Sequence, residues 1–112
     1  MKEQIAAVGT RLLAETMTAM ASDWDELTTE GMDNLLEITT LMAEAGIRSQ
    51  MGEDVSIMVN ACQAAIGNWE SVSLVKAADR SDAIAASVKA GLLVALEIVF
   101  AGAGVAIKAA LV

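Results

Sequence analysis

The residues of this chain that could do acid–base chemistry are its carboxylates, because the 112-residue sequence contains no histidine. Histidine supplies the usual general base, the usual zinc ligand and the base of most nucleophilic triads. Carboxylates lie close together in the sequence at Asp23 with Asp25 and at Glu53 with Asp54. Side chains one or two positions apart point to different sides of a helix, so neither pair is expected to form one site. We therefore predict that the protein is not an enzyme and has no catalytic residues and no metal site.

Sites for a nucleotide or a redox cofactor are not expected either. Residues 102–104 have a faint GxG pattern, but they lie in an apolar helical segment with no preceding strand. Cys62 is the only cysteine, so an internal disulfide is impossible, and its apolar neighbours favour a small buried hydrophobe. Met42 and Met58 occur at helical spacing and are interpreted as adaptable core residues. We predict no cofactor.

Composition predicts an all-α protein. Hydrophobic residues make up 55% of the chain, proline is absent, and the only aromatic residues are two tryptophans and one phenylalanine. The abundant alanine, leucine, methionine and glutamate favour helix over strand. Because 112 residues suffice for one core, we predict a single helical domain over residues 1–112, a helical hairpin or a bundle of three or four helices.

The net charge of the chain limits the partners that we expect, and the charges near its N-terminus limit the expected location. The formal net charge is −8, and the seven lysines and arginines are scattered. Nucleic-acid binding is not expected, because phosphates are neutralised by clustered basic residues. Arg11 and Glu15 interrupt the apolar run that a secretory signal would need, so we expect a cytoplasmic protein.

The stretch from Asn34 to Asp79 organises the predicted fold, because it carries two coiled-coil-like seams. The two seams do not share one phase, since the count slips between Gly46 and Asp54, and this predicts a hinge or a stutter. As one straight helix the stretch would measure about 65 Å, so it either folds back near Gly46 and Gly52 or extends along a partner. We expect such seams to form a homo-oligomer, a dimer or a tetramer. The alternating three- and four-residue spacing joins Leu35, Ile38, Met42 and Ala45 in the first half, and Val55, Met58, Cys62, Ala65, Trp69 and Val72 in the second.

Helices are also expected on either side of that stretch. Apolar spacing predicts a first helix over residues 3–27, followed by a break at 28–34. Asn34 with Glu37 three residues later resembles a capping box, which predicts that the second helix begins there. A second break is expected at 76–83, with Asp79 as the cap of a last helix that runs from about Ser81 to the C-terminus.

The last helix has three possible environments. Between Lys89 and Lys108 its only charged residue is Glu97, so it must be buried on most sides. It could form the centre of a bundle or an oligomer, lie against another apolar surface, or span a membrane over residues 90–107. The membrane is the less favoured environment, because Glu97 would lie in the middle of the bilayer.

The central part of the chain resembles the phasins, small helical proteins that coat polyhydroxyalkanoate storage granules in bacteria. The resemblance covers about residues 30–100 and rests on the opening Asn34, Leu35 and Leu36 and on the break KAADRSDA at 76–83. The chain departs from the family in its more hydrophobic last helix and in Asp82, where glutamate is commoner. The resemblance implies a non-catalytic structural protein that limits granule coalescence and has the granule surface as its partner.

On this interpretation the contact or self-association surface consists of apolar side chains of the seams and of the last helix. The alternatives are a self-assembling subunit of a homo-oligomer or filament and a small single-span membrane protein. The predicted surface residues are Leu35, Ile38, Met42, Val55, Met58, Cys62, Trp69, Val72, Leu92, Leu96 and Val99.

Overall fold

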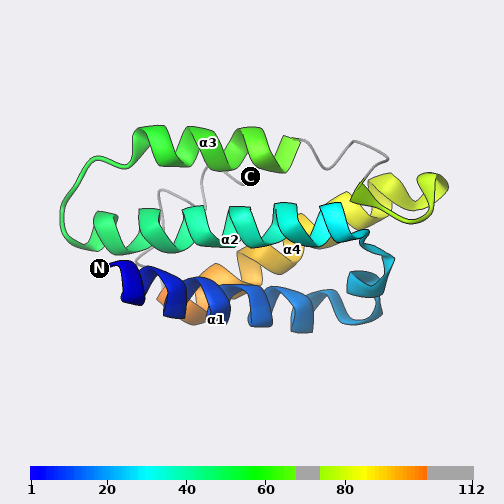
Figure 1. Ribbon diagram of the computed structural model, residues 1–112, viewed down its shortest axis with the longest axis horizontal. Coiled ribbons are helices and arrows are strands. Elements are labelled where there is room, and N and C mark those ends of the chain that lie inside the picture. Colours follow the sequence, from blue (N-terminus) through cyan, green and yellow to red (C-terminus); the bar gives the residue numbers. More distant parts are fainter. Residues whose placement is uncertain (68–73, 101–112) are drawn as a thin grey trace.

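The computed structural model describes residues 1–67 and 74–100, and helices form most of them (Figure 1). The described elements are α1 (Lys2–Met20), the 3-10 segment η1 (Ala21–Glu26), α2 (Thr29–Gln50), α3 (Ser56–Gly67), the 3-10 turn η4 (Ala78–Arg80) and α4 (Ser81–Phe100). Within these ranges the only β-type pairing is a single bridge between Leu27 and Val75. The predicted all-α fold is confirmed, as a bundle of four helices in the described part of the chain.

The second helix begins earlier than the sequence pattern predicts. Thr28 is its N-cap: its backbone is extended, and its side-chain oxygen accepts a hydrogen bond of 3.0 Å from the backbone N–H of Gly31. The Thr28 N–H in turn donates to the carbonyl of Leu74 at 3.1 Å. The predicted cap at Asn34 is wrong, because this contact with a distant segment fixes the extended residue at Thr28, and Asn34 lies inside α2.

The first helix is also shorter than predicted. It ends at Met20, where Ala21 adopts a positive φ of 54°, and residues 21–26 continue as a 3-10 segment. Positive φ is unfavourable for a residue with a Cβ, so it interrupts the helix at this point.

The chain folds back between α2 and α3, as one of the two sequence interpretations proposed. Gly52, with φ of 81°, provides the left-handed residue of the turn, and the N–H of Glu53 donates to the carbonyl of Arg48 at 3.0 Å. Asp54 then caps α3 by accepting bonds from the Ser56 N–H at 3.0 Å and the Ser56 hydroxyl at 2.6 Å. These bonds lower the pKa of the exposed Asp54 carboxyl.

The helices pack in a fixed order. In Figure 1, α1 and α2 lie antiparallel, α4 crosses behind them, and α3 lies along the outer side of α2. Helix α1 packs extensively against both α2 and α4, whereas α3 packs mainly against α2. Close approach needs small residues: a Cβ at Gly91 would lie 3.0 Å from the carbonyl oxygen of Thr16 in α1.

Residues 74–76 form backbone hydrogen bonds with the loop between α1 and α2 and so hold the start of α4 beside that loop. The Lys76 N–H donates to the carbonyl of Glu26 at 2.8 Å, and Arg80 lies 3.5 Å from Asp23. A Cβ at Gly31 would overlap the Leu74 carbonyl, so only glycine allows this approach. These contacts place the first turn of α4 beside η1.

Candidate apolar interaction surface

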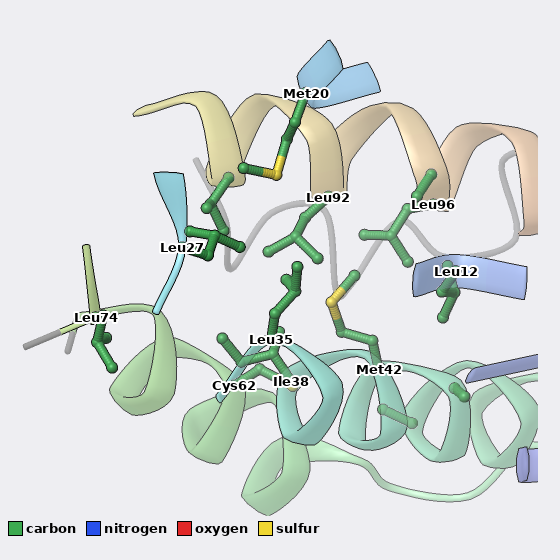
Figure 2. Packing of buried hydrophobic residues seen from close by; sticks show 14 of the residues in the cluster. Leu12, Met20, Leu27, Leu35, Ile38, Met42, Cys62, Leu74, Leu92 and Leu96 are labelled. Atoms are coloured by element: carbon green, nitrogen blue, oxygen red, sulfur yellow. The ribbon is translucent and has the colours of Figure 1, made fainter. Parts of the chain in front are cut away.

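The residues predicted to form an interaction surface mostly lie in the core of the bundle (Figure 2). Met58 and Val99 are partly buried and pack against this core. Trp69 and Val72 lie outside the described residues. The members of the predicted surface that are buried within the chain are Leu35, Ile38, Met42, Val55, Cys62, Leu92 and Leu96.

The first predicted seam is divided between two neighbours. Leu35 and Met42 point toward Leu92, Leu96 and Leu12 of α4 and α1 (Figure 2), whereas Ile38 and Ala45 follow heptad spacing with Ser49 on the adjoining face of α2. Ser49 lines a groove of about 400 Å³ together with Val55, Val59 and Asn60 of the turn and α3. The heptad pattern thus reports packing inside the chain, and these side chains can meet another surface only if the helices separate.

An exposed apolar face was missed by sequence reasoning and lies on α4. The last helix is predicted to run to the C-terminus, and its residues 101–112 lie outside the described residues. For the described part, Ser81–Phe100, the prediction that it is buried on most sides is wrong: 39% of its most apolar 18-residue window is buried. Val94 and Ile98 keep 45% and 46% of their surface exposed, and Ala83, Ala86 and Ala90 are exposed beside them. We call these five residues the outer face of α4. The exposed side also carries the three charged residues of α4, Asp82, Lys89 and Glu97, and their seven- and eight-residue spacing is the sequence signal that identifies this side.

By length and composition α4 could cross a membrane, since its best window has a mean hydropathy of 2.0. Within the bundle, however, its inner side closes the core. Ile84, Val88 and Leu92 are fully buried in the cluster that α4 shares with α1 and α2. Length and composition of this kind are also those of a core helix in a soluble protein.

The acidic side of α2 lies opposite α4. A Cβ at Gly46 would overlap the ring of Phe100, so this side of α2 faces the end of α4. Glu37 precedes Gly46 by nine residues, about two and a half helical turns, and therefore projects from the opposite side. Glu30 and Asp33 are exposed near Glu37 on the same side. The bundle thus has an acidic side and, across the core, the apolar outer face of α4.

Among the described titratable groups, Cys62 is buried and Arg48 forms ion pairs. No group of three or more His, Cys, Asp or Glu side chains that could hold a metal ion occurs among the described residues. Burial raises the pKa of the Cys62 thiol to about 11, so the nucleophilic thiolate is scarce at neutral pH. Arg48 pairs with Glu44 at 3.8 Å and with Glu53 at 3.1 Å, which holds the end of α2 to the turn.

A second shallow groove lies between α1 and α2. Its volume is about 350 Å³, and Ile5, Gly9 and Leu36 are among its lining residues. The hydroxyls of Thr10 and Thr40, which also line it, donate to carbonyls of their own helices at 2.9 and 2.8 Å. Lys2 is the one charged residue of the lining, and apart from the two threonines the remaining lining residues are apolar. The groove therefore adds mainly apolar surface.

No protein-family model matches the chain, and comparisons with curated proteins and with solved structures find no significant match. The resemblance to phasins therefore remains a prediction from the short motifs quoted above, and the function has to be argued from the bundle itself.

Proposed function

We propose that the protein is a non-catalytic structural protein that coats apolar particles in the cytoplasm, with polyhydroxyalkanoate granules as the particle that the sequence resemblance suggests. The observation that carries this proposal is the outer face of α4, where Val94 and Ile98 are each nearly half exposed. Water-exposed apolar surface of this kind favours contact with another apolar surface, because removing it from water lowers the free energy.

The opposite side of the bundle supports the same proposal. With the outer face of α4 on a particle, the acidic side of α2, marked by Glu30, Asp33 and Glu37, points to water. Coated particles would then carry like charge, since the chain has a net charge of −8. Like-charged particles repel one another over about 8 Å at physiological ionic strength, which opposes coalescence.

The first test is co-sedimentation of the purified protein with polyhydroxybutyrate particles, polystyrene particles and anionic lipid vesicles, with the oligomer mass recorded in solution. We expect binding to both neutral apolar particles and weak binding to vesicles. A stable oligomer that ignores every particle would refute the proposal and favour a self-assembling subunit. Binding to vesicles alone would favour a membrane protein.

Two matched variants locate the contact. Val94→Asp with Ile98→Asp places two charges on the outer face of α4 and should weaken particle binding by at least about tenfold, since burying a charge against an apolar surface is costly. Leu36→Asp is the control: Leu36 is similarly exposed, at 49%, but lines the α1–α2 groove. It should bind as the wild type does. Equal losses in both variants would show that α4 is not the contact.

A further inference from the structure

Trp24 is an exposed aromatic residue to which the proposed contact has given no role. It lies in η1 and keeps 40% of its surface exposed. Its side chain combines a large apolar ring system with one polar group, the indole N–H, which donates a hydrogen bond and cannot accept one. Among the described residues this N–H has no hydrogen-bond acceptor. A side chain of this kind suits the boundary between an apolar phase and water.

The backbone at Ala21 keeps Trp24 at the surface. In one continuous helix, Trp24 would lie one turn after Met20 and on the same side. Met20 is 3% exposed, so this side of the helix faces the core. Ala21 instead has a φ of 54°, which ends α1 and turns the following residues away from its path. Positive φ strains a residue with a Cβ, and such strain is concentrated at functional sites.

Helix α1 borders the outer face of α4 along one edge. Gly91, Val94 and Ile98 are neighbours on the surface of α4, because they are three and four residues apart. Gly91 packs against α1: a Cβ there would lie 3.0 Å from the carbonyl oxygen of Thr16 and 3.2 Å from the side chain of Met20. Val94 and Ile98 are exposed. The edge of the outer face that contains these two residues therefore runs beside α1.

The segment η1 continues this border to the beginning of α4. It follows α1 directly, and Figure 1 shows it at the same end of the bundle as the start of α4. A carboxylate oxygen of Asp23 lies 3.5 Å from a guanidinium nitrogen of Arg80, the residue that precedes α4. Trp24 is the next residue after Asp23, and Ala83 is the first residue of the outer face. The outer face thus has an exposed aromatic residue at its beginning and exposed aliphatic residues toward its end.

We infer that Trp24 is part of the particle contact and that its indole N–H donates to ester carbonyls, so that the protein prefers a polyester to a hydrocarbon surface. This assignment rests on the proposed function and specifies the chemical class of particle. The aliphatic side chains of the outer face have no hydrogen-bonding groups and cannot make this distinction. When the ring lies on a particle, its N–H leaves water, and an N–H without an acceptor is unfavourable. Ester carbonyl oxygens accept this bond, whereas polystyrene has no carbonyl.

Tryptophan emission measures directly whether Trp24 enters the contact. Trp69→Phe leaves Trp24 as the single tryptophan of the chain. When polyhydroxybutyrate particles are added, we expect the emission of Trp24 to shift to shorter wavelength and to become protected from quenching by acrylamide. A protein that sediments with the particles while this emission stays unchanged would overturn the inference and leave the proposed function standing.

Trp24→Phe separates the N–H from the ring, because phenylalanine keeps an aromatic ring and has no donor. The loss of ring area affects binding to polyhydroxybutyrate and to polystyrene alike. Only on polyhydroxybutyrate should the dissociation constant rise by a further factor of about three to ten, which is the contribution of one hydrogen bond. The control is Leu36→Ala, since Leu36 is 49% exposed but lines the α1–α2 groove. It should bind both particles as the wild type does.

The comparison of the two particles distinguishes the outcomes. Equal losses on both would overturn the selection of a polyester by the N–H, and unchanged binding to both would remove Trp24 from the contact. A wild-type protein that binds neither particle would refute the proposed function and this inference together. Circular dichroism and urea unfolding check that Trp24→Phe keeps its fold, so that a loss reports binding.

Discussion

The contact between Gly46 and Phe100 shows which side of α2 faces the end of α4. The backbone of Gly46 is covered by the Phe100 ring so closely that a Cβ there would overlap it. We predict that Gly46→Ala destabilises the bundle relative to a glycine-to-alanine change elsewhere in a buried helix. The matched control is Gly9→Ala, because a Cβ at Gly9 would meet its nearest neighbours at an ordinary 3.6–3.8 Å.

The magnitude follows from two opposing terms. Alanine is favoured over glycine in a helix interior by about 1 kcal/mol, and both variants receive this gain. Only Gly46→Ala must also displace the Phe100 ring, which costs about 1–3 kcal/mol for an overpacked core. The gain is common to both variants, so the free energy of unfolding of Gly46→Ala should be lower than that of Gly9→Ala by about 1–3 kcal/mol.

Urea unfolding followed by circular dichroism measures this difference, and Phe100→Leu completes a double-mutant cycle. In the Phe100→Leu chain the ring is gone, so Gly46→Ala should stabilise the protein much as Gly9→Ala does. If both glycine variants stabilise the wild-type chain equally, Phe100 does not cover Gly46. The placement of α4 opposite the acidic side of α2 would then be wrong. The proposal that the protein binds a particle through α4 and exposes its acidic side to water would be wrong as well.

Two further predictions concern the start of α2 and the buried thiol. Thr28→Ala should lower the free energy of unfolding by about 1 kcal/mol through loss of the N-cap, whereas Asn34→Ala should change it little. If urea unfolding shows a larger effect at Asn34, then Asn34 is the N-cap, as the sequence pattern predicts. Burial raises the pKa of the Cys62 thiol from 9.0 to about 11. The thiol of the unfolded chain therefore ionises first as pH rises, so stability is lost between pH 9 and 11, by up to about 3 kcal/mol. Cys62→Ala should remove this part of the pH dependence, and identical pH profiles for the two proteins would show that the folded thiol titrates normally.

Several features could be predicted from the sequence because they depend on local chemistry. The absence of proline and the excess of alanine, leucine and methionine specify helices. The slip in heptad phase between Gly46 and Asp54 marks the turn, where Gly52 takes its positive φ. The apolar periodicity also selects most of the core, since Leu35, Ile38 and Cys62 are fully buried. The absence of histidine leaves no general base of the usual kind.

Tertiary contacts decided the rest. Thr28 starts α2 because Leu74, far along the chain, accepts a bond from its backbone, and no local pattern contains that information. Periodicity identifies which side chains are apolar but not what covers them, so the seams could equally have joined two chains. In α4 the spacing of Asp82, Lys89 and Glu97 marks the side that meets water, but it does not show that Val94 and Ile98 stay uncovered on that side. Their exposure depends on where the other helices lie, and it makes the outer face of α4 the candidate contact.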